Sequence, residues 1–144
     1  MKSNTRFVLK GIIFLFNITK HNLIFYLQVS DLLDHKDSFV SRHEKYFDLL
    51  FDKGTYDAIS LNPEGAKLKR LSYISSCKRL LKPGGLFAVT SCNWTFEELK
   101  QHFCDNHNED ETFEVFSKIP TPSFKFGGVV GNQVTSVILK LNKS

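Results

Sequence analysis

The sequence predicts an α/β fold, in which helices join the strands of a sheet that ends in an antiparallel strand pair. Residues 47–51 and 86–90 are apolar runs typical of buried strands, and a helix-forming segment separates them. We therefore expect these two strands to be adjacent and parallel, with the helix crossing over between them. Residues 112–119 and 133–141 also have strand composition without a helix between them, which favours a terminal hairpin at one edge.

The segments before the first buried strand are less regular. Residues 23–30 are rich in Ile, Phe, Tyr and Val, a composition typical of a strand. Residues 35–46 are charged and polar, which indicates a loop or a short surface helix.

The crossover helix is expected to span residues 64–81. Asn62 suits its N-cap and Pro63 its first helical position, and the helix ends before Pro83-Gly84-Gly85. Apolar residues recur every three or four positions, as in a helix that covers a sheet. We expect its buried face to contain Leu68, Leu71, Ile74, Cys77 and Leu81.

A second helix is expected after the second buried strand. Thr95 and Glu98 have the spacing of a capping box, which predicts a helix running to about residue 103. Gly127-Gly128 lies between the last two strands. No Lys-Ser/Thr pair or helix start follows it, so a hairpin connection is favoured over a phosphate-binding loop.

Composition argues against several functional classes. The net charge of +4 comes from scattered Lys and Arg residues, which do not indicate nucleic-acid binding. No stretch approaches the roughly 18 apolar residues of a membrane span. Three cysteines without a C-x-x-C pair and five scattered histidines predict neither a disulfide framework nor a metal site. We expect at most one domain, monomeric and cytoplasmic, with the nucleus as a second location.

Polar residues follow both buried strands at their carboxyl ends, where open α/β sheets bind ligands. The turn Asp52-Lys53-Gly54-Thr55 follows the first strand, and Tyr56 and Asp57 come next. Asn93 and Trp94 follow the second strand. From the residues alone, Asp52 is either a turn cap or a carboxylate of the site. Trp94 is either a wall of the substrate pocket or a core residue. Asp57 is either a group of the site or an anchor for the segment that follows it.

Four segments resemble the S-adenosylmethionine-dependent, seven-strand methyltransferases; they read FDLLFDKGTYDAISL, LLKPGG, TSCNWTFEEL and PTPSFKFGG. Within that superfamily, they are most similar to the lysine methyltransferases of translation elongation factor 1-alpha. The resemblance covers about residues 29–144. It implies a Rossmann-like, mostly parallel sheet with a C-terminal antiparallel hairpin, S-adenosylmethionine as cofactor, and elongation factor 1-alpha as the protein substrate.

The resemblance also implies roles for the strand-end residues. Methyl transfer to lysine needs a neutral amine aligned with the methyl donor in a dry pocket, and carboxylates and aromatic faces can receive that amine. The implied catalytic residues are Asp52, Thr55, Tyr56, Asn93 and Trp94. The implied cofactor-binding residues are Asp31 and Leu32 near the adenine, and Asp52, Lys53 and Gly54 in the turn. From the residues alone, Asp31 equally suits a helix N-cap or a turn.

The chain departs from the family at its N-terminus. Gly11 is the only glycine before Gly54, so the family's Gly-rich cofactor turn has no counterpart. We therefore expect an N-terminally truncated fold, with residues 1–22 as an atypical segment and residues 23–144 as the C-terminal portion of a methyltransferase domain. Residues 7–18 are the candidate for a substitute strand in the gap. Weak cofactor binding follows, and the alternative function is a non-catalytic fragment that retains a protein-binding surface.

Overall fold

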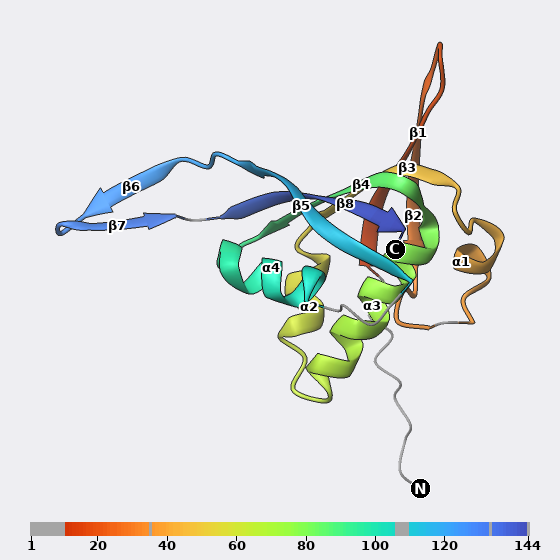
Figure 1. Ribbon diagram of the computed structural model, residues 1–144. Coiled ribbons are helices and arrows are strands. Elements are labelled where there is room, and N and C mark those ends of the chain that lie inside the picture. The colour runs from red at the N-terminus through yellow and green to blue at the C-terminus, as the bar shows by residue number, and fades with distance from the viewer. Residues whose placement is uncertain (1–10, 35, 106–109, 133, 144) are drawn as a thin grey trace, which may run out of the picture.

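Figure 1 shows the computed structural model, which describes residues 11–34, 36–105, 110–132 and 134–143. Its helices and strands are, in chain order, β1 (Gly11–Ile18), β2 (Leu23–Ser30), α1 (Ser38–Arg42), β3 (Phe47–Lys53), α2 (Thr55–Ser60), α3 (Ala66–Leu80), β4 (Leu81–Ser91), α4 (Phe96–Cys104), β5 (Glu111–Ile119), β6 (Ser123–Phe126), β7 (Val129–Asn132) and β8 (Thr135–Lys143). Six strands form one sheet in the order β2-β1-β3-β4-β8-β5, and β6 and β7 form a separate two-stranded sheet.

The two buried strands lie side by side, as predicted. β3 and β4 pair in parallel, with Leu50 opposite Phe87 and Lys53 opposite Thr90. α2 and α3 form the connection between them. The expected crossover is therefore confirmed, and it brings the carboxyl ends of both strands to the same edge of the sheet.

The prediction of a mostly parallel sheet is wrong for the described residues. β3–β4 is the single parallel pair among the five pairs of the six-stranded sheet. β1 and β2 are joined only by residues 19–22, and so short a connection allows only antiparallel pairing. β1 then runs antiparallel to β3, with Phe14 opposite Phe51. β1 is the substitute strand expected from residues 7–18, of which residues 7–10 lie outside the described part.

The helices α2, α3 and α4 lie together on one side of the six-stranded sheet (Figure 1). Along β3, Leu50 and Asp52 are fully buried, whereas Leu49 and Phe51, which point to the opposite side, are half-buried. Cys77 of α3 is fully buried in the hydrophobic core, as predicted. The strand ends that carry the candidate site are thus supported by a core between the sheet and these helices.

Helix α3 begins later than the sequence predicts. Its first residue is Ala66, and Gly65, with a φ of 66°, holds the N-cap position in the left-handed region. Asn62 does not cap the helix. Its Oδ1 instead accepts a hydrogen bond from the backbone N–H of Glu64 (3.0 Å), so it closes a turn before the helix.

The predicted buried face of α3 is also wrong in its first two turns. Ile74, Cys77 and Leu81 are buried, but Leu68 and Leu71 are 71% and 41% exposed. All buried residues of the helix lie from Tyr73 onward. Only the second half of the helix packs into the core.

The C-terminal elements agree with the sequence. Thr95 and Glu98 form the predicted capping box, each accepting a hydrogen bond from the other's backbone N–H. β5 and β8 pair antiparallel at one edge of the sheet. The connection between them is the β6–β7 hairpin, which projects from the body of the molecule (Figure 1). Gly127 and Gly128 both have positive φ at its turn, so the predicted hairpin is confirmed.

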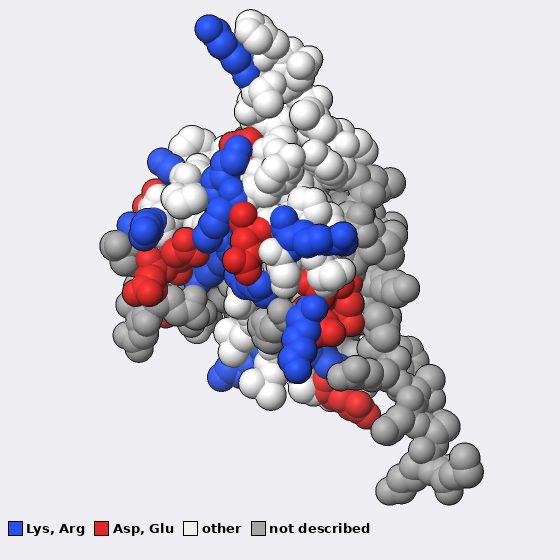
Figure 2. Space-filling view, turned by 90° about the vertical axis from the view of Figure 1, so that its right-hand side faces the viewer, with Lys and Arg blue, Asp and Glu red and all other residues white. Residues whose placement is uncertain are grey.

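Figure 2 shows the charge on one face of the molecule. Lys and Arg side chains alternate with Asp and Glu there, without a field of a single sign. The projection at the top, where Figure 1 places the β1–β2 hairpin, is largely uncharged. Its exposed apolar residues are Ile18, Leu23, Ile24 and Phe25. Among the described helices, none is long and apolar enough to cross a membrane.

Candidate active site

Three strands end at the same edge of the sheet. The register places Ser30 of β2 opposite Gly11, and Lys53 of β3 opposite Thr90 of β4. β2 and β3 run in the same direction because each is antiparallel to β1, which lies between them. The segments after these strand ends carry Asp31, Asp52 and Asn93. The structure therefore brings those three predicted residues to one edge.

Asp52 is completely buried at the end of β3. Its carboxylate accepts hydrogen bonds from the N–H groups of Thr55 and Tyr56 (2.9 Å each) and from the Tyr73 hydroxyl (2.5 Å). Burial raises the pKa of the Asp52 carboxyl, and these hydrogen bonds oppose that rise. The geometry is that of a cap, because the carboxylate satisfies the first N–H groups of α2.

The rest of the turn divides into open and closed positions. Gly54 has a φ of 89°, which an L side chain rarely adopts, and nothing lies within 4 Å of where a Cβ would sit. Lys53 is exposed, whereas Thr55 is buried. Lys53 and the backbone at Gly54 are therefore the accessible parts of this turn.

Asp57 joins α2 to the loop that follows β4. One carboxylate oxygen accepts from the Ser91 hydroxyl (2.5 Å), and the other accepts from the Cys92 N–H (2.8 Å). Ser91 Oγ in turn accepts from the N–H groups of Asn93 (3.1 Å) and Trp94 (3.0 Å). Asp57 therefore anchors the neighbouring strand's loop, rather than the segment that follows it in the chain.

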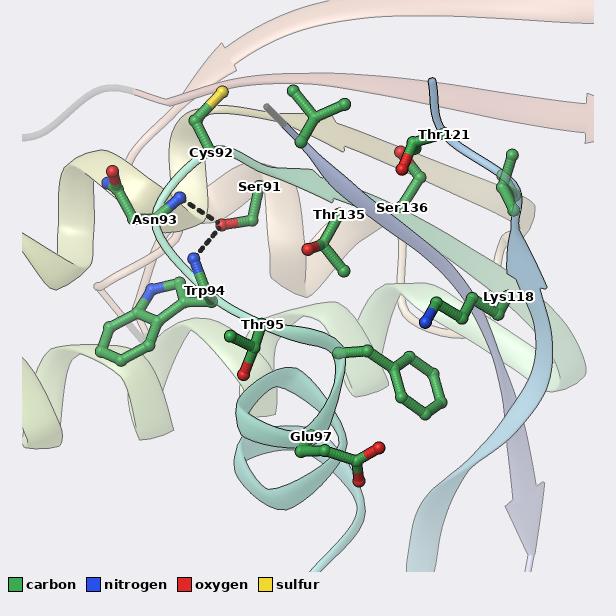
Figure 3. A pocket seen from close by; sticks show the side chains of 13 residues that line it. Ser91, Cys92, Asn93, Trp94, Thr95, Glu97, Lys118, Thr121, Thr135 and Ser136 are labelled. Carbon is green, nitrogen blue, oxygen red and sulfur yellow. Dashed lines mark hydrogen bonds between the residues drawn. The ribbon is translucent and has the colours of Figure 1, made fainter. Parts of the chain in front are cut away.

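The loop at the end of β4 lines a cavity of about 440 Å³, which extends toward β5 and β8 (Figure 3). Lys118 reaches from β5 over the ring of Phe96, with 4.8 Å between its Nζ and the ring centroid. The lining residues are Ser91, Cys92, Asn93, Trp94, Thr95, Phe96, Glu97, Lys118, Ile119, Thr121, Val134, Thr135 and Ser136. The mixture of hydroxyl, amide and aromatic groups suits a partly polar ligand such as an extended amine side chain.

Tyr56 and Trp94 both contact His102 of α4. The Tyr56 hydroxyl is hydrogen-bonded to His102 Nδ1 of α4 (2.9 Å), and burial raises the pKa of Tyr56. The Trp94 ring meets the His102 ring edge-on, with 4.7 Å between centroids. Burial, together with the Arg70 charge, lowers the pKa of His102, while Glu98 opposes that shift. Trp94 is half-buried against the core, so it serves as a core residue and as a cavity wall.

Asp31 and Leu32 lie at the end of β2. Asp31 Oδ1 accepts from the N–H of Leu33 (3.1 Å), which is the turn geometry that the residue alone allowed. Its carboxylate is partly exposed, and Leu32 is buried in the core. Their suggested place beside an adenine stays a prediction, as do the catalytic roles of the other site residues.

The sequence did not single out two residues that organise this site. Ser91 orders the β4 loop through three hydrogen bonds, and its position directly after a buried strand was the available signal. His102 joins Tyr56 to Trp94, but no local pattern distinguishes it, because its partners lie on other elements. Within the described ranges, no cluster of His, Cys, Asp and Glu is arranged to hold a metal ion.

Comparison with known proteins finds several relatives, although no protein-family model matches the chain. EEF1A lysine methyltransferase 2 of Homo sapiens is 44% identical over 114 residues, which are 79% of this chain and 44% of that protein. The protein of the same name from Danio rerio is 43% identical over the same shares. Protein-lysine N-methyltransferase efm4 of Schizosaccharomyces pombe is 34% identical over 135 residues, 89% of this chain and 52% of that protein. The chain thus spans about half the length of the relatives it matches.

Proposed function

We propose that the chain belongs to the methyltransferase family that contains these relatives, and that it acts in the methylation of a lysine side chain of elongation factor 1-alpha. S-adenosylmethionine is the proposed methyl donor. The observation that carries the proposal is the link between the carboxyl ends of β3 and β4. Asp52 fixes the turn after β3, and Asp57 fixes the loop after β4 that carries Asn93 and Trp94. We also propose that the protein is monomeric and cytoplasmic, with access to the nucleus.

The described residues could hold only part of S-adenosylmethionine. Asp31 offers a partly exposed carboxylate, and Gly54 offers open backbone, at the same edge of the sheet. Between these two positions lies β1, which runs antiparallel to β3 and so brings its first residue, Gly11, to this edge. If β1 ran parallel to β3, the loop after β1 would lie at this edge. The backbone N–H groups of that loop could then bind the methionine part of S-adenosylmethionine. Among the described residues, only the adenine side and the turn therefore fit the group.

S-adenosylmethionine, when bound, supplies an electrophilic methyl group. The chain's own residues must then present a neutral lysine amine, and the cavity beside Asn93 and Trp94 can receive an extended side chain. Its aromatic walls, Trp94 and Phe96, can hold the amine in its cationic form before it loses a proton. Asp52 has both carboxylate oxygens engaged and is completely buried, so we assign it to holding the turn rather than to touching the amine.

The non-catalytic alternative is not favoured, since the named relatives are methyltransferases. A methylation assay tests the proposal. Purified elongation factor 1-alpha that lacks lysine methylation is incubated with the chain and isotope-labelled S-adenosylmethionine at millimolar concentration. We expect the isotope label to appear on a lysine of elongation factor 1-alpha. The Asn93→Ala variant, with its fold checked by circular dichroism, should transfer much less label. Lysine labelling that Asn93→Ala leaves unchanged, or no lysine labelling at all, would contradict the proposal.

A further inference from the structure

The first half of α3 exposes apolar side chains that its period would place in the core. Leu68 is 71% exposed and Leu71 is 41% exposed, while Ile74, one turn further on, is buried. Leu61, just before this helix, is also 71% exposed. A single exposed leucine is ordinary, but several together beside a hollow mark a surface that a partner covers.

A hollow of about 410 Å³ lies between α3 and α4, and of these three leucines Leu71 lines it. We call it the α3–α4 groove and define it by Lys67, Arg70, Leu71, Ile74, Gln101 and His102. Tyr56 also lines it, as does Asp105, which follows α4. The α3 side of the groove therefore combines two apolar and two basic residues, and the α4 side is polar.

The charge of the groove selects the chemistry of its ligand. Lys67 and Arg70 contribute two cations, and Asp105 is the only carboxylate among the lining residues. In the part of the chain that the structure describes, neither cation forms an ion pair. A groove that combines apolar side chains with two cations and a single carboxylate is complementary to a polypeptide segment that carries an apolar side chain next to carboxylates.

The groove also contacts the candidate active site through one side chain. The Arg70 guanidinium lies 5.4 Å from the centroid of the Trp94 ring, and the His102 ring meets the same indole edge-on. The Trp94 backbone N–H is bonded to Ser91 in the loop at the end of β4. Trp94 thus separates the α3–α4 groove from the cavity at the strand ends.

We propose that the α3–α4 groove docks a segment of the protein substrate, one with an apolar side chain flanked by carboxylates, while the target lysine enters the cavity on the other side of Trp94. This docking surface rests on the proposed function, because it takes elongation factor 1-alpha as the partner. It adds a second contact that is separate from the reacting lysine. Leu71 in the groove receives the apolar side chain, together with the exposed Leu68 one helical turn earlier on α3, and Lys67 and Arg70 receive the carboxylates.

Binding of purified elongation factor 1-alpha to the immobilised chain, measured by biolayer interferometry without cofactor, tests the docking. The groove variant is Leu68→Glu with Leu71→Glu. Its matched control is Leu23→Glu with Ile24→Glu, which puts the same charges on similarly exposed residues of the β1–β2 hairpin. We expect the control to bind as the unmodified chain does and the groove variant to bind more than about tenfold more weakly. Equal binding by both variants, or no binding by the unmodified chain, would overturn the proposal.

A second readout follows Trp94, the only tryptophan in the chain. With 5-fluorotryptophan at this position, we expect its ¹⁹F resonance to shift when elongation factor 1-alpha is added to the unmodified chain, and to stay in place in the groove variant. An unshifted resonance in the unmodified chain would contradict docking beside Trp94. Asn93→Ala separates the two proposals, since it is expected to keep groove-dependent binding while losing methylation. Docking without methylation would therefore leave the groove standing and remove the catalytic proposal.

Discussion

Two buried carboxylates hold the candidate site together, one at the end of β3 and one in the first turn of α2. Asp52 satisfies the first N–H groups of α2 and accepts from Tyr73, and Asp57 fixes the loop after β4. The sequence predicted the turn and its glycine, but it left Asp52 open as a cap or a site carboxylate. Whether Asp52 acts as a cap or as a site carboxylate depends on Tyr73, which lies 21 residues away on α3. The sequence of the turn does not indicate this partner.

Replacement of Asp52 by Ala should destabilise the fold strongly. The substitution leaves two N–H groups and the Tyr73 hydroxyl without their acceptor in a buried place, and we expect a loss of about 3 kcal/mol in the free energy of unfolding. Urea denaturation followed by circular dichroism gives this quantity. Asn93→Ala is the control, because its side chain is exposed and should change stability by no more than about 0.5 kcal/mol. Equal midpoints for the two variants would refute the capping role.

His102 should make the surroundings of Trp94 sensitive to pH. Burial and the Arg70 charge lower the His102 pKa below its usual 6.5, with Glu98 opposing. The stabilisation from the neutral ring is therefore complete above pH 6.5 and is lost as the pH falls through the lowered folded-state pKa. The fluorescence of Trp94 should change with a midpoint below 6.5 and stay flat in His102→Gln. A midpoint above 6.5, or a titration that survives the substitution, would contradict this geometry.

At the scale of elements, the cap of α4 was predictable, but the cap and the burial of α3 were not. The capping box of Thr95 and Glu98 is a local pattern, and the structure contains it. The face of α3 was predicted from period alone, which places Leu68 and Leu71 with Ile74. The helical period predicts which side chains share a face of the helix, but not whether another element packs against that face. Only the second half of α3 packs against the core.

The loop at the end of β4 should loosen when its anchor is removed. Ser91→Ala deletes the hydroxyl that donates to Asp57 and accepts from the N–H groups of Asn93 and Trp94. We expect amide hydrogen exchange at Trp94 to accelerate by about tenfold, as expected for one lost hydrogen bond of about 1 kcal/mol or more. The Glu98 amide, which Thr95 caps, is an internal reference and should exchange at an unchanged rate. If the Trp94 amide keeps its protection, Ser91 does not order the loop.

At the scale of the whole molecule, the adjacent parallel strands and the terminal antiparallel pair were predictable because each follows from the order of elements along the chain. The direction of β1 was not. It is set by the four-residue connection to β2, which turns the chain back and makes β1 antiparallel to β3 as well. The sheet thus keeps the expected neighbours on one side of β3 and acquires an antiparallel hairpin on the other.

That hairpin limits what the described residues can do for a cofactor. Asp31 and the Gly54 turn lie at the same edge of the sheet, but among the described residues β1 brings no strand-end loop between them. Several hydrogen bonds to the methionine and ribose parts are then missing, each with a net value of about 1 kcal/mol and more where charge is involved. Their combined loss corresponds to orders of magnitude in affinity.

Titration of the ¹⁵N-labelled 144-residue chain with S-adenosylmethionine, followed by amide chemical shifts, tests this account most directly. We expect weak binding, with a dissociation constant of about 1 mM or higher. The shifts should be confined to one edge of the sheet, at Asp31, Leu32, Gly54 and Asn93, and the α3–α4 groove amide of Gln101 should remain unshifted. A micromolar dissociation constant, or shifts centred away from this edge, would contradict the account.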